Sequence, residues 1–258
     1  MLGNRPWSLI ARNVLRRENY AALWRMRQVA VQPRATAWRY LTGRGEYPWR
    51  CPVRTPLGIV APLTFSHHDL VTVTEVFCRL DYEAPPDVRV VVDLGSNIGI
   101  SALYFMTRNA DVRCHLFEPV ARNVARLREN LVGFEDRYRL TEAAVWDRDG
   151  TVEFGVEPTG RYGGIGVAGE TIEVPCLDIN RVLDSVLEHA PAVDLLKIDT
   201  EGAELATVGA IRNDVLARIG LIYLETMERP SVHTDRFDAA FACDTLRLAN
   251  RELQRGRA

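Results

Sequence analysis

Short apolar runs alternate with helical stretches along most of the chain from residue 88 onward. The runs are rich in β-branched residues and occupy residues 88–94, 112–117, 139–145, 193–198 and 220–225. Helical patterns begin near residues 100, 120 and 203, in the gaps between these runs. Strands that alternate with helices form βαβ units, and near-continuous apolar strands are typical of a parallel sheet that is buried on both faces. The pattern therefore predicts a doubly wound, Rossmann-like α/β fold with a mostly parallel sheet.

The first 84 residues follow a different pattern. Residues 8–31 read as a helix with weak periodicity, residues 48–63 as a β-hairpin, and residues 69–80 as a further helix. We therefore divide the chain into an N-terminal helical and hairpin cap, residues 1–84, and a main domain, residues 85–258.

A longer insertion separates the third predicted strand from the fourth. It covers residues 146–192 and contains a glycine-rich stretch, residues 159–166. Backbone this rich in glycine is either mobile or closely approached by another group. We interpret the stretch as a loop that gates access of a substrate.

Charge is distributed unevenly although the whole chain has a net charge of only −2. Residues 1–54 contain eleven arginines and two acids, Glu18 and Glu46, which gives this segment a charge of +9. Four of the five tryptophans also lie there, namely Trp7, Trp24, Trp38 and Trp49. The favoured interpretation is that the tryptophans pack the cap onto the main domain. The alternative is peripheral membrane contact through residues 1–50, since Trp and Arg settle at anionic headgroups.

The hydrophobic runs and the cysteine spacing bear on where the protein resides and on whether it contains disulfides. No run of about 18 apolar residues and no small-residue cleavage site is present, so we expect neither a membrane span nor a secretory signal. We expect a cytoplasmic protein, with peripheral contact at the inner membrane face as the alternative. The five cysteines are scattered without a C-x-x-C pair, which argues against disulfides and against a structural zinc site.

The first motif is VVVDLGSNIG at residues 90–99, an apolar strand that enters a glycine turn and then a helix. It differs from the dinucleotide fingerprint G-x-G-x-x-G, because Asp93 precedes the first glycine, Gly95, where a pyrophosphate would be repelled. A cationic ligand fits better. The ammonium and sulfonium groups of S-adenosylmethionine have the charge that this position favours.

Two further motifs stand at the ends of later strands. Glu118 ends the second strand 23 residues after Gly95, where an acid can accept the hydroxyls of a ribose. Residues 194–204 read DLLKIDTEGAE and contain the only lysine of the chain, Lys197. A chain that otherwise uses arginine and keeps one lysine favours a role for its compact ammonium group. The alternative is a structural cluster, in which Lys197 pairs with Asp199 or Glu201 and the acids cap the next helix.

Together these motifs resemble those of the FkbM-type methyltransferases over residues 50–225. The resemblance rests on residues 92–99, on Phe117-Glu118-Pro119, on Cys176-Leu177-Asp178 and above all on residues 196–204. It implies a seven-stranded sheet of order 3-2-1-4-5-7-6, S-adenosylmethionine as cofactor, and O-methylation of sugar hydroxyls in glycolipids or of polyketide hydroxyls. One departure concerns residues 247–255, which read poorly as a terminal β-hairpin. We therefore expect the sixth and seventh strands to be shortened or missing.

The predicted cofactor site gathers the turn and the strand ends. It comprises Asp93, Gly95, Ser96, Asn97, Gly99, Glu118, Pro119, Ala144 and Asp199. In the implied strand order the first and fourth strands are neighbours at the point where the order reverses. The glycine turn and the cluster that follows the fourth strand would then line one crevice.

The predicted catalytic groups lie in the same crevice. An alkyl hydroxyl is a weak nucleophile, so we expect a general base, either Asp199 or Glu201, with Lys197 orienting it or the acceptor oxygen. The alternative base is the pair His67 and His68. For the acceptor substrate we predict contacts from Arg161, Tyr162 and Glu225. A divalent metal held by Asp199 and Glu225 is possible but not favoured, because two carboxylates are a thin ligand set.

Other classes of function stay open at this point. A nucleotide-dependent oxidoreductase is disfavoured by Asp93 and by the missing third glycine. A non-catalytic adenosyl-binding scaffold, with a membrane- or partner-binding N-terminus, is the main alternative. Nucleic-acid methylation is disfavoured because no aromatic-prolyl motif typical of base methylation is present, so we expect a small-molecule or glycolipid acceptor and no nucleic acid.

Overall fold

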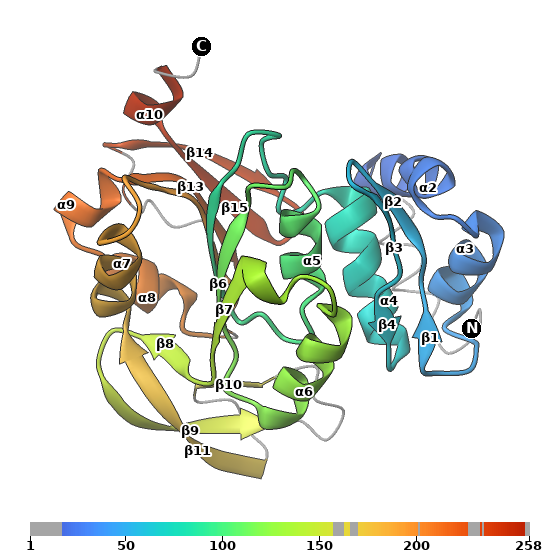
Figure 1. Ribbon diagram of the computed structural model, residues 1–258, viewed down its shortest axis with the longest axis horizontal. Helices are drawn as coiled ribbons and strands as arrows, with labels where there is room; N and C mark the ends of the chain where they lie inside the picture. The colour runs from blue at the N-terminus through green and yellow to red at the C-terminus, as the bar shows by residue number, and fades with distance from the viewer. Residues whose placement is uncertain are drawn as a thin grey trace.

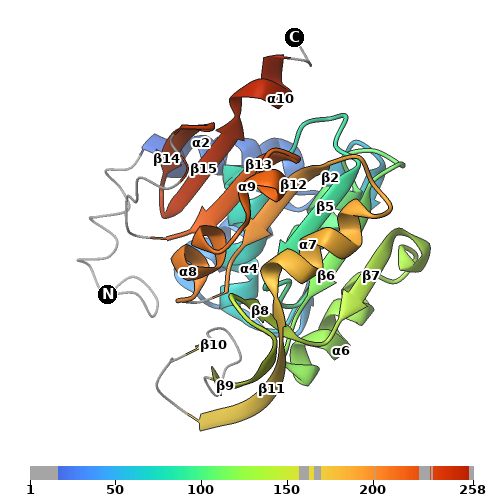
Figure 2. The same ribbon diagram turned by 90° about the vertical axis from the view of Figure 1, so that its left-hand side faces the viewer.

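A seven-stranded sheet forms the centre of the computed structural model, which describes residues 17–156, 163–165, 170–200, 202–226, 233 and 235–255. The strands are β5 (Val90–Leu94), β6 (Arg113–Phe117), β7 (Tyr138–Thr141), β12 (Val193–Ile198), β13 (Ile219–Glu225), β14 (Phe237–Ala242) and β15 (Thr245–Asn250). Their order is β14-β15-β13-β12-β5-β6-β7, parallel from β7 to β13; Figure 1 shows the sheet, and Figure 2 labels all seven of these strands. This is the order 3-2-1-4-5-7-6, as the family resemblance implies.

Both faces of this sheet are buried, because successive side chains of a strand point to opposite sides. Val92 and Leu94 join the cluster beneath helices α7 (Ile179–Leu187), α8 (Glu204–Gly209) and α9 (Asn213–Leu216). Val91, the residue before Val92, joins the cluster beneath α5 (Ile100–Met106) and the N-terminal elements. The two groups of helices lie on opposite sides of the strands (Figures 1 and 2). The predicted doubly wound fold is confirmed.

The terminal hairpin is present, so the prediction of shortened or missing last strands is wrong. Strand β15 pairs antiparallel with β13 from Thr245 to Ala249, and β14 pairs with β15 as the edge strand. Helix α10 (Arg251–Arg255) follows. The pattern is obscured because three consecutive positions of β14, residues 238–240, are exposed, and because Arg247 interrupts the apolar run of β15.

The third predicted strand divides into two, which lie in different sheets. Its first part is β7, and its last residues form β8 (Ala144–Trp146). A second sheet of order β10-β9-β11-β8 is built from β8 and the predicted insertion, with β9 (Gly150–Val156), β10 (Gly163–Ile165) and β11 (Glu170–Asp178). In Figure 2 this small sheet lies below the central one. The insertion therefore has its own strands, whose apolar side packs around Phe154 and Val174.

The N-terminal elements confirm the predicted hairpin and add a helix. Strands β2 (Val53–Thr55) and β3 (Gly58–Val60) pair antiparallel, flanked by the pair β1 (Trp49–Arg50) and β4 (Leu63–Thr64). Helix α2 (Arg17–Val29) is the described part of the first predicted helix. Helix α3 (Pro33–Thr42) was not predicted. Its first residue is a proline, which cannot continue α2 yet fits the first turn of a new helix.

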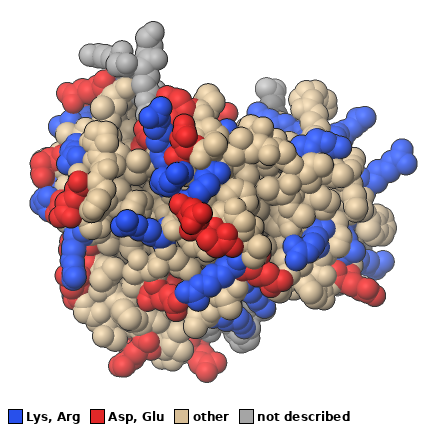
Figure 3. All heavy atoms as spheres, viewed as in Figure 1, with Lys and Arg blue, Asp and Glu red and all other residues tan. Residues whose placement is uncertain are grey.

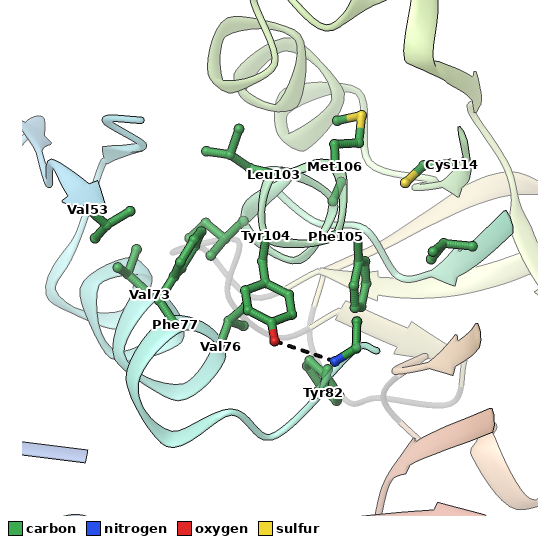
Figure 4. Close-up of a cluster of buried hydrophobic side chains, with 14 of the residues drawn as sticks. Val53, Val73, Val76, Phe77, Tyr82, Leu103, Tyr104, Phe105, Met106 and Cys114 are labelled. Atoms are coloured by element: carbon green, nitrogen blue, oxygen red, sulfur yellow. Dashed lines mark hydrogen bonds between the residues drawn. The ribbon is translucent and has the colours of Figure 1, made fainter. Parts of the chain in front are cut away.

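The second predicted helix of the cap joins it to the central domain. It consists of α4 (His67–Thr74) and the π-helical turn η1 (Glu75–Arg79). Val76 and Phe77 face α5, where the ring of Phe77 meets Tyr104 edge-on at 5.4 Å between centroids (Figure 4). The connections after β6 and before β7 contain α6 (Ala121–Asn130) and η2 (Glu135–Arg137). One hydrophobic cluster thus spans the predicted boundary at residue 84, and the division into two domains stays a prediction.

The tryptophans of the cap do not pack as expected. Trp24 on α2 is 61% exposed and Trp38 on α3 is 60% exposed, so the favoured packing interpretation is wrong for these two. Trp49 does pack partly against the core, beneath the guanidinium of Arg39. Basic side chains predominate over this region on the right of Figure 3. All five cysteines are free, and four of them are buried.

Candidate active site

A tight turn at the carboxyl end of β5 forms the floor of the site. Gly95 has φ +75° and Asn97 has φ +48°, both in the left-handed region. The backbone N–H groups of Gly95 and Ser96 donate to the carbonyl of Phe117 at 3.0 Å each, which ties the turn to the end of β6. A Cβ on Gly95 would lie 1.8 Å from the carbonyl oxygen of Asp199. Only glycine fits here, because the ends of β5 and β12 approach so closely.

Lys197, in β12, connects this turn to two carboxylates. Its Nζ lies 3.1 Å from Asp93 Oδ1 and 3.0 Å from Asp199 Oδ2, and it donates to the carbonyl of Gly95 at 3.1 Å. The side chain is 2% exposed. Burial alone would lower the pKa of Lys197, but the charges of Asp199 and Asp93 outweigh it and hold the pKa above its usual value. The ammonium is therefore a fixed positive charge that holds the strand ends together.

Asp93 is a buried partner of Lys197 and does not line the cavity. Its side chain is 0% exposed, and Ser101 Oγ donates to its second oxygen at 2.6 Å. We predicted Asp93 as a group that meets a cationic ligand directly. Its position favours an indirect role, in which it fixes Lys197 and the glycine turn.

Glu118 stands directly after β6, beside the turn. Oε2 accepts from the N–H of Asn97 at 2.9 Å, and Oε1 accepts from the N–H of Val120 at 3.0 Å and from Asn123 Nδ2 at 3.2 Å. Burial raises the pKa of Glu118 to about 7, and these donors oppose the rise. A carboxylate offers about four lone-pair positions. Oε2 therefore retains the capacity to accept a ribose hydroxyl.

The other predicted cofactor residues surround Glu118 and the turn. Pro119 follows Glu118 and is half-buried, and Gly99 has φ +83° at the start of α5. Ala144 is buried at the start of β8, just beyond the carboxyl end of β7. All stand at one edge of the sheet, because the carboxyl ends of parallel strands share an edge.

A cavity of about 230 Å³ opens beside the turn and is walled partly by the cap. The central domain contributes Gly95, Ser96, Asn97, Lys197, Asp199 and Glu225, among others. The residues that the cap contributes include Glu75 and Tyr82, which sequence reasoning missed. No sequence motif contains Glu75 or Tyr82, because folding of the cap is what brings them to the strand ends. The one feature of the sequence that could have indicated Tyr82 is its position as a single aromatic residue just before the main domain.

Tyr82 and Glu225 meet across the cavity although 143 positions separate them. Tyr82 Oη donates to Glu225 Oε2 at 3.0 Å, and the ring of Tyr82 lies 5.2 Å from Lys197 Nζ. The negative charge of Asp199, assisted by burial and by Glu75, raises the pKa of Glu225 to about 9. Because Glu225 is exposed at its strand end, the neighbouring carboxylates are the main cause. The raised pKa favours the protonated form of this carboxyl, which can donate a hydrogen bond as well as accept one.

The remaining predicted residues divide into two groups. His67 and His68 begin α4, with His67 packed beside Gly43 at the end of α3, and neither lines the cavity. Glu201, Arg161 and Tyr162 lie outside the described residues. Within the described ranges, no group of three or more His, Cys, Asp or Glu side chains can hold a metal ion.

Comparisons with known proteins give a family match and some more distant likenesses. The model of the "Methyltransferase FkbM domain" matches residues 93–249, more than half of the chain. The 2-O-methyltransferase NoeI of Sinorhizobium fredii (strain NBRC 101917 / NGR234) is 42% identical over 65 residues, which is 25% of this chain and 26% of that protein. The AMB antimetabolite synthetase AmbE of Pseudomonas aeruginosa is 26% identical over 197 residues, covering 62% of this chain and 9% of that protein.

The chain thus spans only a small part of the length of these two relatives. Among solved structures, the methyltransferase FkbM from Methylobacillus flagellatus KT has a TM-score of 0.44 and 15% identity, and the match covers 71% of this chain and 54% of that one. The family model covers the glycine turn, Glu118, the Lys197 cluster and the terminal hairpin. On that match, the chain belongs to the FkbM methyltransferase family.

Proposed function

We propose that this protein is an S-adenosylmethionine-dependent O-methyltransferase whose acceptor is a small or amphiphilic molecule, such as a glycolipid sugar or a polyketide. The observation that carries the proposal is the glycine turn bound to Lys197 beside an acid-lined cavity. A ligand with an ammonium and a sulfonium suits such a cavity electrostatically. The partial match to a protein named a 2-O-methyltransferase supports oxygen as the acceptor atom.

The residues of the cavity suit an in-line displacement. When bound, the cofactor supplies an electrophilic methyl group. Asp199 is 22% exposed, accepts one bond from Lys197, and has an oxygen left to take the proton of an acceptor hydroxyl. Tyr82 and Glu225 can orient that hydroxyl while the cap limits its access to water. We propose accordingly that residues 85–258 bind the cofactor and that residues 1–84 contribute to acceptor binding.

Calorimetric titration tests the cofactor. We expect the purified protein to bind S-adenosylmethionine and S-adenosylhomocysteine, and Glu118→Gln to weaken both about tenfold, because a charge-assisted bond to the ribose is lost. The matched control is Glu142→Gln, which removes an exposed carboxylate paired with Arg128 at 2.8 Å. Binding of a nicotinamide dinucleotide instead, or of none of these by folded protein, would contradict the proposal.

Replacement of Asp199 tests the base. We expect Asp199→Asn to lower kcat about a hundredfold, because the amide cannot take the proton, while binding of S-adenosylhomocysteine stays within a few fold. Product analysis with a labelled methyl group shows whether the label resides on oxygen. As a control, Asp184→Asn removes an exposed partner of Arg212 and should leave kcat unchanged. Cofactor binding without transfer to any hydroxyl acceptor would support the scaffold alternative.

Peripheral membrane contact is a second proposal, supported by exposed Trp24 and Trp38 among the arginines of the cap. No helix within the described ranges is long and apolar enough to cross a membrane. We expect co-sedimentation with phosphatidylglycerol-containing vesicles, reduced about tenfold in Trp24→Ser/Trp38→Ser because two interfacial side chains are lost. Val132→Ser, at another apolar residue that is 70% exposed, is the control. Equal binding by wild type and double variant would refute the contact.

A further inference from the structure

A second recess lies behind the active-site cavity, where the cap meets the terminal hairpin. It has a volume of about 340 Å³. Helix α2 provides one wall, the turn that follows η1 provides a second, and one face of β13, β14 and β15 provides the floor. Neither the predicted site nor the proposed mechanism uses any residue of this recess.

Three arginines line the recess, namely Arg25, Arg79 and Arg247. Arg79 is occupied, because it forms ion pairs with Asp81 and, at 3.3 Å, with Glu75. Arg25 reaches only the backbone carbonyls of Cys78 and Arg79, at 3.4 Å each. Within the part of the chain that the structure describes, neither Arg25 nor Arg247 has an acid within ion-pair distance.

Small side chains flank Arg247 on the side of the edge strand β14. Arg247 lies opposite Tyr223 on β13 and opposite Ala240 on the edge strand β14, so these three side chains share one face of the sheet. Ala240 and Ala242 are both exposed, and Ala21 faces them from α2. With Tyr223 on one side and the small Ala240 on the other, Arg247 can present its guanidinium edge to a ligand. Two acids, Asp81 and Glu83, also line the recess, but Asp81 is already neutralised by Arg79.

Only one layer of side chains separates the recess from the active-site cavity. Arg79 lines the recess while its partner Glu75 lines the cavity. In the same way the ring of Tyr223 meets that of Tyr82 edge-on at 5.9 Å between centroids. Asp244 lines the cavity, and the preceding Cys243 lines the recess. A molecule that passes over this hairpin turn can occupy both.

We propose that the recess is a binding site for an oxyanion, a phosphate or carboxylate group, and that this group belongs to the methyl acceptor. Guanidinium groups bind both oxyanions through paired, charge-assisted hydrogen bonds. The reacting hydroxyl and the anionic group would then sit on the two sides of the hairpin turn. The existence of the oxyanion site stands on Arg25 and Arg247 alone, whereas its assignment to the acceptor rests on the proposed function.

A matched pair of substitutions on the exposed edge strand tests the site. Ala240→Glu places a carboxylate opposite Arg247, where it neutralises the guanidinium, and Ala240→Gln fills nearly the same volume without charge. The probe is inorganic phosphate, titrated by calorimetry into the full chain. We expect wild type to bind phosphate, Ala240→Glu to bind it at least tenfold more weakly, and Ala240→Gln to retain more of the affinity than Ala240→Glu. Arg247→Gln should match Ala240→Glu.

Two further measurements identify the source of the oxyanion and check the fold. Every variant should bind S-adenosylhomocysteine as wild type does, which shows intact protein and separates this site from the cofactor site. Vesicles of phosphatidylcholine with phosphatidic acid, compared with phosphatidylcholine alone, test a lipid headgroup as the source. Arg34→Gln, on the exposed face of α3, removes an equal charge outside the recess. If wild type binds no phosphate, or if Arg34→Gln weakens binding as much as Arg247→Gln, the oxyanion site is wrong.

Discussion

Replacement of Lys197 by methionine is expected to lower the free energy of unfolding by about 3–5 kcal/mol, because it leaves a buried carboxylate without its partner. Asp93 is 0% exposed, and in the wild type its charge is balanced by Lys197 Nζ at 3.1 Å. Methionine fills a similar volume, so the loss of stability comes mainly from the unpaired charge of Asp93. Urea denaturation followed by circular dichroism measures the effect. Cofactor binding should weaken as well, since Nζ also holds the carbonyl of Gly95 at 3.1 Å.

The double variant Lys197→Met/Asp93→Asn separates charge from packing. With the buried charge removed, most of the lost stability should return, because replacing a whole buried ion pair costs far less than breaking it. Arg212→Met provides the comparison at the surface, where Arg212 pairs with Asp184 at 2.8 Å and both side chains are 46% exposed. That exposed pair should contribute about 1 kcal/mol at most. A double variant as unstable as the single one would show that Lys197 acts through packing.

The strands that sequence could predict are those buried on both faces. Residues 193–198 were predicted as a strand and form β12 with the same bounds, because five of its six side chains are buried and four of the six residues are apolar. The terminal hairpin escaped prediction for the opposite reason. Strand β14 is an edge strand with only Phe237 buried, and it is held by pairing with β15. Its stability comes from long-range contacts that no local pattern records.

The same distinction applies to the candidate site. Gly95, Glu118 and Lys197 were found because each stands at the end of a predicted strand, where an α/β sheet gathers its ligand-binding groups. Glu75 and Tyr82 were missed because η1 and its following turn reach the strand ends only when the cap folds onto α5. The burial of Asp93 was missed too. The sequence shows that Asp93 stands near the end of a strand, but it does not show whether the carboxylate meets a ligand or the side chain of Lys197 on the neighbouring strand.

The glycine turn gives the second large expected effect. Gly95→Ala should destabilise the protein by about 3–5 kcal/mol and abolish cofactor binding, because the added methyl group meets backbone and not a movable side chain. The new Cβ would lie 1.8 Å from the carbonyl oxygen of Asp199, so the ends of β5 and β12 must separate. That separation also lengthens the contact between Lys197 and the turn. Urea denaturation and titration with S-adenosylhomocysteine measure the two effects.

Gly133→Ala isolates the part of this effect that comes from backbone conformation. Gly133 has φ +89°, close to the +75° of Gly95, but nothing lies within 4 Å of the position that its Cβ would take. Gly133→Ala should therefore lower the free energy of unfolding only by the cost of a left-handed backbone at alanine, about 1–2 kcal/mol, and leave cofactor binding unchanged. The difference between the two variants then measures the close approach of the strand ends. If both variants lose the same stability, the backbone of Asp199 does not restrict the residue at position 95. The ends of β5 and β12 would then lie further apart than the structure shows.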